Sequence, residues 1–384
     1  MKKTTRFQAI AFAAIRIVIN TMHRMVYPFL AVFSRGLGVD LTTLSRVLAI
    51  RSLVGVIGPL FATIGDSRGR KFAMMLGLGL FTLGTSVVVF WPTFTAFAAA
   101  LVLTALGKLL FDPTMQAYIG DRVPYERRGR VLAVTELGWS LAFIIGIPLM
   151  GFLISKWGVI APFWTLSLLG VCSLLLLNWM IPRDTISSDG NPGTLANFHK
   201  VIRYSPALAG LAVGLFSSAA NEVINLVFGV WMETSFGLQI AALGAAAAVI
   251  GFAELTGESL VGVWVDRIGK PRAIAMGLLA NSLTALIFPF LGQTLPGAVF
   301  GLFLFYLTFE FTLVSTIPMM TEILPSARAT MMAINISALS LGRALGAFVA
   351  PILFAWGMGT SAGAAVVFNI LALIALRWVR YHDS

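Results

Sequence analysis

Long apolar stretches separated by short polar segments form the pattern of this chain from end to end. A helix needs roughly 20 apolar residues to cross about 30 Å of hydrocarbon. Twelve stretches reach that length, with Pro, Gly and charged residues at the joints between them. We predict spans at residues 8–33, 41–64, 72–90, 94–118, 130–155, 161–181, 206–231, 239–264, 273–291, 297–320, 329–355 and 361–377. The pattern therefore predicts an all-α polytopic membrane protein.

The longest polar segment lies in the middle of the chain, at residues 182–205. It contains a run of turn-forming residues at 189–193, where Asp, Gly, Asn, Pro and Gly follow one another. We therefore expect a linker here, between an N-terminal bundle of six spans (residues 1–181) and a C-terminal bundle of six (residues 206–384).

Composition narrows the class of protein further. Of the 384 residues, 58% are hydrophobic and only 11% are charged, and the mean hydropathy is +0.90. A water-soluble fold cannot hide this much apolar surface, so an ordinary soluble enzyme and a disordered chain are both excluded. An outer-membrane barrel is excluded as well, because its strands alternate polar and apolar residues.

Several kinds of site are not expected from this sequence. Cys172 is the single cysteine, so no disulfide or cysteine metal site is predicted. The sequence has no phosphate-binding glycine loop and no zinc or nucleophile pattern, so we expect no enzyme activity, ATP use, cofactor or metal. The first span follows residues 1–7 without a small-residue cleavage pattern, so a cleaved signal peptide is not expected.

The net charge of +11 reflects membrane topology rather than nucleic-acid binding. Of the 27 Lys and Arg residues, 19 fall in loops on one side of the predicted membrane, and only Arg35 and Lys156 fall on the other. Basic loops stay in the cytoplasm. We therefore expect both termini and the linker to be cytoplasmic, in the inner or plasma membrane of a bacterium.

The two halves repeat the same loop features. Asp66 follows the second span and Asp266 the eighth, 200 residues apart, and each precedes a glycine and several bases. Pro124 follows the fourth span and Pro325 the tenth, 201 residues apart, again beside acids and arginines. Two features at nearly one offset predict a six-plus-six duplication, as in one class of transporters.

The loop 66–71, with sequence Asp-Ser-Arg-Gly-Arg-Lys, resembles the D-x-x-G-R-[KR] signature between helices 2 and 3 of the major facilitator superfamily. The loop from Asp121 to Gly129 is similar to the family's helix 4–5 signature. Residues 146–151 are similar to the helix 5 motif of its antiporters, with Ile147 inserted between Gly and Pro. The chain departs from the family at Ala62, where Gly is usual, and at Leu103, where Arg is usual. The resemblance is strongest to proton-coupled efflux members.

These loops are predicted to gate the protein. Acids and bases at the cytoplasmic face would pair with helix ends or with opposing charges and hold the two halves together when the cavity opens outward. A solvated turn that only obeys topology is the alternative. The candidate gating residues are Asp66, Gly69, Arg70, Lys71, Asp121, Arg128, Asp266, Arg267, Gly269, Glu322 and Arg328.

Charged residues within the spans are the main functional signal, because an ionised group is costly in hydrocarbon and should face protein or water. The bases are Arg16, Arg24, Arg46, Arg51, Lys108 and Arg343, and the acids are Asp112, Glu136, Glu222, Glu254, Glu258 and Glu310. Spans 3, 6, 9 and 12 have none. The family resemblance implies that helices 1, 4, 7 and 10 line the cavity and that helices 3, 6, 9 and 12 face lipid.

Spacing suggests specific partners. Arg16 and Asp112 lie at similar depth on spans 1 and 4, where an ion pair is plausible. Glu254 and Glu258 lie one turn apart, and burial beside another acid favours the protonated form. The proton-coupling candidates are Glu222, Glu254, Glu258, Glu310 and Asp112. The substrate-cavity candidates are Arg16, Asn20, His23, Arg24, Arg51, Lys108, Asn221, Asn225 and Arg343. Arg46 is expected to be an anchor near a membrane surface.

The function predicted from the sequence is secondary active transport by alternating access, with a small-molecule substrate, protons and the lipid bilayer as partners. Proton-coupled efflux of an amphipathic or drug-like compound is the leading hypothesis. Proton-coupled transport of an anionic solute or lipid headgroup is one alternative. A non-transporting membrane assembly, pigment- or lipid-handling factor is another. We expect a monomer and no nucleic-acid partner.

Overall fold

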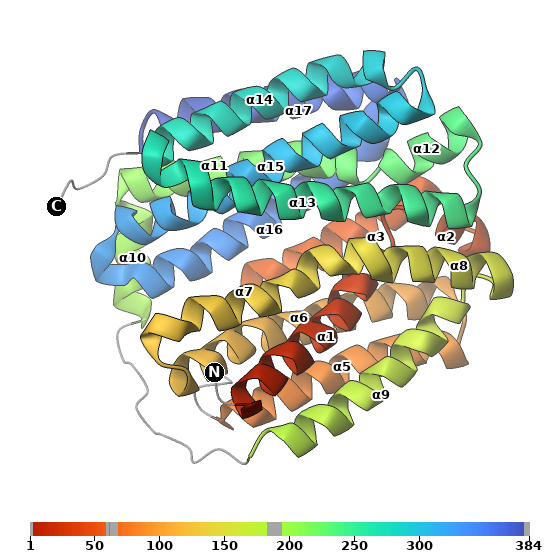
Figure 1. Cartoon of the computed structure of the whole chain (residues 1–384). Coiled ribbons are helices and arrows are strands. Elements are labelled where there is room, and N and C mark those ends of the chain that lie inside the picture. Colours follow the sequence, from red (N-terminus) through yellow and green to blue (C-terminus); the bar gives the residue numbers. More distant parts are fainter. Residues whose placement is uncertain (1–2, 59–60, 62–67, 183–193, 380–384) are drawn as a thin grey trace. The chain divides into compact units, whose positions relative to one another are not determined.

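The computed structural model describes residues 3–58, 61, 68–182 and 194–379, and within them every regular element is a helix (Figure 1). In the first half these are α1 (Lys3–Arg24), α2 (Leu30–Leu37), α3 (Leu41–Val54), the 3-10 turn η1 (Gly55–Ile57), α5 (Arg70–Phe90), α6 (Phe94–Arg122), α7 (Tyr125–Leu141), the π-helical turn η2 (Ala142–Gly146), α8 (Ile147–Trp157) and α9 (Ala161–Met180).

The second half has the same succession of long helices. Its elements are α10 (Thr194–Arg203), α11 (Ser205–Asn225), α12 (Phe228–Phe236), α13 (Ile240–Ile268), α14 (Lys270–Leu291), α15 (Leu295–Ile323), the 3-10 turn η3 (Pro325–Ala327), α16 (Arg328–Phe354) and α17 (Met358–Leu376).

Ten of the twelve predicted spans are long and apolar enough, within the described residues, to cross a membrane. The remaining two coincide with α1–α2 and with α3–η1. α1 contains several charged residues, including Arg16 and Arg24, and the predicted continuation of α3 falls partly outside the described residues. The structure thus places helices at each of the twelve predicted positions.

Two spans differ from the predicted continuous helices. The first breaks between Arg24 and Leu30, where Pro28 has no N–H to donate. The seventh breaks at the corresponding place, between Asn225 and Phe228. The linker also contains a helix, α10, which the sequence analysis did not predict. Its residue Val201 is fully buried and packs into the core of the second unit.

The internal repeat is visible in the backbone itself. All six glycines with positive φ in the described residues form three pairs: Gly38 with Gly237, Gly69 with Gly269, and Gly158 with Gly357. Within a pair the φ angles differ by no more than 14°, for example 95° at Gly69 and 89° at Gly269. Threonine side chains cap α6 and α15 in the same way: the N–H of Ala96 donates to Oγ1 of Thr93, and the N–H of Gly297 donates to Oγ1 of Thr294. The halves thus turn their chain at equivalent residues.

The contacts divide the chain into two compact units. The first contains α1, α2, α5 to α9 and the part of α13 up to Gly251. Within it α5 packs between α6 and α9, and α1 packs on α7 (Figure 1). The second contains α3, η1, α10 to α12, the rest of α13 and α14 to α17. Within it α11 contacts α15, α16 and α17, and α3 packs on α16.

Helices without charges in their spans have an exposed apolar face. On α9 the exposed residues Trp164, Leu168, Val171, Leu175 and Trp179 recur every three or four positions. α14 and α17 show the same spacing of exposed Leu, Ile and Phe side chains. An apolar stripe at helical spacing, turned away from the protein, is suited to lipid contact. These helices are the ones that the sequence analysis assigned to the lipid boundary.

Candidate functional site

The charged side chains of the spans lie mainly inside the protein. Six of them have 6% or less of their surface exposed: Arg16, Arg24, Arg51, Glu222, Glu254 and Glu310. Lys108, Asp112, Glu136, Glu258 and Arg343 are half-buried. Arg46 is exposed, as expected for an anchor. Placing these groups inside the protein avoids the cost of ions in hydrocarbon.

In the first unit, Arg16 brings three helices together. Its Nε lies 3.3 Å from Oδ1 of Asp112 on α6, which confirms the predicted ion pair. Its NH1 lies 2.7 Å from Oε1 of Glu136 on α7 and also donates to the carbonyl of Thr135 at 2.9 Å. The planar guanidinium can serve several acceptors at once because its five N–H groups point in fixed directions.

Lys108 extends this group of charges along α6. Its Nζ donates to Oδ2 of Asp112 at 2.5 Å and to Oδ1 of Asn20 at 2.6 Å. Asn20 in turn donates to the carbonyl of Gly138 at 3.0 Å. We call Arg16, Asn20, Lys108, Asp112 and Glu136 the arginine cluster. Its two bases and two acids cancel to no net charge, provided that all of them are ionised.

An aromatic wall lies beside the arginine cluster. The guanidinium carbon of Arg24 lies 3.6 Å from the ring centre of Trp139 and 4.3 Å from that of Phe143. Lys108 Nζ lies 5.2 Å from the same indole ring, and the His23 ring lies 6.4 Å from it. Arg24 also donates to the Trp139 carbonyl at 3.3 Å. Cation–π contacts of this kind stabilise a positive charge away from water.

In the second unit, a chain of hydrogen bonds leads to a buried acid. Tyr306 on α15 donates its hydroxyl to Oδ1 of Asn225 at 2.6 Å. The Asn225 amide donates to Oε2 of Glu222 at 3.2 Å, on the same helix. We call Glu222, Asn225 and Tyr306 the carboxylate cluster. Glu222 is only 1% exposed.

Several other predicted residues are buried in the second unit. Glu310 and Glu254 are buried on α15 and α13, whose backbones approach closely where Gly257 meets Leu307 and Glu310. Asn221 is buried on α11, and among the described residues its Oδ1 accepts no hydrogen bond. Arg51 is buried on α3. The roles proposed for Glu258 and Arg343 stay predictions.

The loop candidates form two equivalent ion pairs. Arg70 Nε lies 3.2 Å from Oδ2 of Asp121 in the first unit, and Lys270 pairs with Glu322 in the second. Corresponding members are 200 and 201 residues apart, as the repeat requires. Gly69 and Gly269 precede these bases with positive φ, a conformation that glycine adopts without strain. Each observed pair joins two loops of one half. Contact between the halves stays a prediction.

Further hydrogen bonds fix the remaining loop residues. Lys71 donates to the carbonyl of Asn178 at 2.8 Å, Arg128 to that of Gly120, and Arg328 to that of Thr321 at 3.0 Å. Arg267 is exposed. Asp66 lies outside the described residues, and so does the side chain of Asp266.

Comparison with known proteins decides the family. The profile described as Major Facilitator Superfamily matches residues 12–219 and again residues 210–384. The chain belongs to this superfamily. It is thus a multi-pass membrane protein and a secondary transporter, and the two successive matches agree with the internal repeat.

The similar proteins include transporters of Bacillus subtilis (strain 168). The chain is 21% identical over 375 residues to "Uncharacterized MFS-type transporter YbcL", covering 96% of this chain and 90% of that one. It is 22% identical over 344 residues to "Multidrug resistance protein 2", covering 86% and 84%. The fold is similar, with a TM-score of 0.78 and 16% identity over all of both chains, to an inward-facing, unoccupied bacterial homologue of the human lysosomal transporter Spinster.

The helix 5 motif of this superfamily member has a packing role in the structure. A Cβ at Gly146 would lie 2.0 Å from Oγ1 of Thr21 on α1, and one at Gly151 would lie 3.0 Å from Phe29 and 3.1 Å from the carbonyl of Ile240. The π-helical turn η2 ends at Gly146, just before Pro148. The motif glycines therefore allow α1 and the first part of α13 to approach η2 and α8.

Several residues of the protein interior escaped the sequence analysis. Trp139, Phe143 and Tyr306 lie in apolar stretches, where an aromatic residue is ordinarily a core or lipid-facing group. Asn281 and Asn369 are buried on helices assigned to the lipid boundary, and Asn369 donates to Oδ1 of Asn281 at 2.8 Å. A lone asparagine in an apolar span was the available signal for the last two.

Proposed function

We propose that this transporter expels a small amphipathic, drug-like compound in exchange for protons. Glu222 is the observation that supports the proton step. Its carboxyl group is 1% exposed, and it accepts a hydrogen bond from the neutral amide of Asn225. Burial away from water makes the ionised form of a carboxyl group more costly, so a buried acid is a candidate for taking up a proton.

Glu254 and Glu310 are further proton sites in this proposal. Both are buried in the second unit, on helices that approach each other at Gly257. Asp112 is a secondary candidate, since it already pairs with Arg16 and Lys108. Glu258, which is half-buried, is another. Asn221, whose Oδ1 accepts no hydrogen bond among the described residues, offers an acceptor to a donor group of the substrate.

Support for an amphipathic cargo comes from two sources. The aromatic wall of Trp139 and Phe143 offers apolar ring faces, and these faces already contact the Arg24 cation. One relative, to which the chain is similar over 84% of that protein's length, is named a multidrug resistance protein. In this proposal the transporter works as a monomer in a bacterial inner membrane, with both termini in the cytoplasm, and the loop ion pairs help to close the cytoplasmic side.

The test is flux in proteoliposomes under an imposed pH gradient, with ethidium as the amphipathic probe. We expect Glu222→Gln to abolish pH-driven flux, and Glu254→Gln or Glu310→Gln to reduce it. Glu233→Gln is the matched control, because Glu233 lies near the end of α12 and belongs to neither cluster. Unchanged pH-driven flux in all three core variants would exclude proton coupling through these acids.

A second candidate cargo is an anionic solute. In the first unit, the arginine cluster and Arg24 together hold three bases against two acids. Arg51 is a buried base of the second unit. A thermal-shift screen with charged solutes separates the two cargoes. Stabilisation by anions that is lost in Arg24→Gln or Arg51→Ala favours an anionic solute. Stabilisation by cationic amphiphiles that survives both substitutions favours efflux of the drug-like compound.

A further inference from the structure

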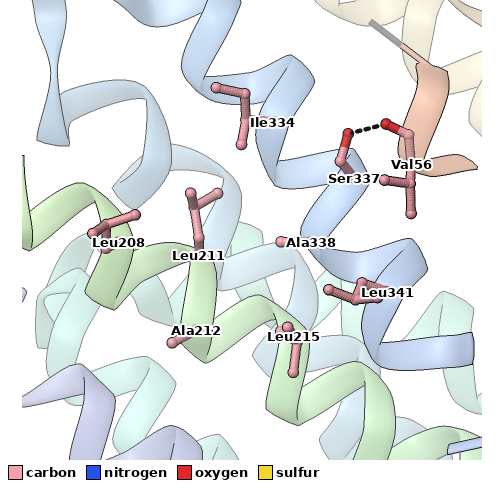
Figure 2. A pocket seen from close by; sticks show the side chains of 9 residues that line it. All are labelled: Val56, Leu208, Leu211, Ala212, Leu215, Ile334, Ser337, Ala338 and Leu341. Carbon is pink, nitrogen blue, oxygen red and sulfur yellow. Dashed lines mark hydrogen bonds between the residues drawn. The ribbon is translucent and has the colours of Figure 1, made fainter. Parts of the chain in front are cut away.

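An apolar pocket lies in the second unit, on the part of α11 and α16 nearest the linker. Its volume is about 330 Å³, and it is lined by Val56, Leu208, Leu211, Ala212, Leu215, Ile334, Ser337, Ala338 and Leu341. Figure 2 shows α11 and α16 on its two sides, with Val56 of η1 at its edge. The size is at the lower end of the range for ligand pockets, about 300–1,000 Å³.

The lining follows from the spacing of residues on the two helices. Positions 208, 211, 212 and 215 of α11 and positions 334, 337, 338 and 341 of α16 both follow an i, i+3, i+4, i+7 pattern. Each helix therefore presents one face to the pocket. Farther along, the helices touch directly, since a Cβ on Gly342 would lie 2.0 Å from the carbonyl oxygen of Leu215. The gap is thus confined to the linker side of this contact.

The chemistry of the lining favours a purely apolar occupant. Ser337 is the polar residue among the nine, and its hydroxyl donates to the carbonyl of Val56 at 2.9 Å. Leu208 and Leu341 are 46% and 44% exposed, so the pocket opens to the surface of the second unit. In a chain that spans a bilayer, an apolar opening of this kind suits an acyl chain. A methylene group is about as large as a water molecule, which occupies about 30 Å³. The pocket therefore has room for roughly ten methylene groups of an acyl chain.

A basic helix lies at the linker end of the same two helices. α10 contacts α11, α16 and η3. It is fixed there by Val201, which is fully buried with Ala207, Ile323 and Ala327. Lys200 and Arg203 are exposed beside it, and so are the apolar Phe198 and Ile202. An amphipathic helix with exposed bases and apolar side chains is typical of a membrane surface.

A third base lies close in sequence to the pocket. Arg328 is the first residue of α16, six positions before Ile334, and is exposed. It uses one of its N–H groups on the carbonyl of Thr321. Glu322, in the last turn of α15, is already engaged by Lys270. The linker side of α10 and α16 is therefore positively charged, which complements an anionic headgroup.

We propose that this pocket binds one acyl chain of an anionic glycerophospholipid, whose phosphate is held by Lys200, Arg203 and Arg328. The lipid comes from the leaflet that faces the linker. The acyl chain fills the gap between α11 and α16, and the charge of the headgroup selects among lipids. The proposal concerns a lipid site outside both clusters and does not depend on what the transporter moves.

Native mass spectrometry of the purified protein, titrated with phosphatidylglycerol or phosphatidylcholine, tests the proposal. We expect one retained phosphatidylglycerol per chain, bound at least tenfold more tightly than phosphatidylcholine. Ala338→Phe and Ala212→Phe fill the pocket from opposite walls, and each should weaken phosphatidylglycerol binding at least tenfold. Ala280→Phe is the matched control, since Ala280 is exposed on α14, and it should bind as the unaltered protein does.

The headgroup site has its own variant. Lys200→Gln with Arg203→Gln should abolish the preference for phosphatidylglycerol while weak binding of both lipids persists. Thermal unfolding of each variant shows that it is folded. Wild-type binding in the folded Ala338→Phe and Ala212→Phe variants, or retention of detergent alone, would overturn the proposal. Equal affinity of the unaltered protein for the two lipids would overturn the headgroup assignment. These are binding measurements, so their outcome is separate from that of the flux experiments.

Discussion

The Nε atom of Arg16 lies 3.3 Å from Oδ1 of Asp112, and this ion pair joins α1 to α6 inside the first unit. The same guanidinium contacts Glu136 on α7, so one buried base connects three helices. In the second unit, hydrogen bonds from Tyr306 to Asn225 and from Asn225 to Glu222 join α15 to α11. The two halves of the repeat therefore share a backbone plan but differ in the chemistry at their centres.

Replacement of Arg16 should destabilise the first unit. Arg16→Met leaves Asp112 and Glu136 without this base, and breaking a buried ion pair costs about 3–5 kcal/mol. Both acids are partly exposed, so we expect a loss of roughly 2 kcal/mol. Thermal unfolding in detergent, followed by tryptophan fluorescence, measures the change. Arg46→Met is the control, because Arg46 is exposed, and an equal loss in both variants would contradict the prediction.

The Asn281–Asn369 pair should stabilise the packing of α14 against α17 and α15. Asn281 also donates to the carbonyl of Phe305 at 2.8 Å and to the hydroxyl of Thr308 at 3.0 Å. Hydrogen bonds between membrane helices contribute about 0.6–2 kcal/mol, so Asn281→Leu should cost somewhat more than Asn369→Leu. A double-mutant cycle on thermal unfolding measures the coupling. Strictly additive losses would show that the two amides do not stabilise each other.

The contact of α11 with α16 should depend on the absence of a side chain at Gly342. A Cβ there would lie 2.0 Å from the backbone oxygen of Leu215, which cannot rotate away. Gly342→Ala should therefore lower the free energy of unfolding by about 1–3 kcal/mol or more, as overpacking does. Gly363→Ala on α17 is the matched control, since nothing lies within 4 Å of a Cβ at that position. It should be neutral or stabilising by about 0.5–1 kcal/mol.

The two loop ion pairs should matter little for stability. Asp121 and Glu322 are 57% and 46% exposed, and exposed pairs contribute about 0–1 kcal/mol. Asp121→Asn and Glu322→Gln should therefore leave the unfolding midpoint nearly unchanged. A clear loss of flux in these stable variants, with partial recovery when Arg70→Asp is combined with Asp121→Arg, would indicate a conformational role. A loss of stability above about 2 kcal/mol would contradict the exposed-pair explanation.

The membrane-spanning stretches, the six-plus-six repeat and the charged residues inside the protein can all be predicted from the amino-acid sequence. Hydropathy over 20 residues and the offset between similar loops are properties of the chain, and an ion in a span must be buried whatever the detailed packing. The tertiary structure decided which groups meet. Arg16 could have paired with several acids, and Trp139, Tyr306 and Val201 showed no signal beyond their apolar character. Their contacts depend on the rotation and approach of helices more than 80 residues apart, which are set by close packing at glycines such as Gly146 and Gly342.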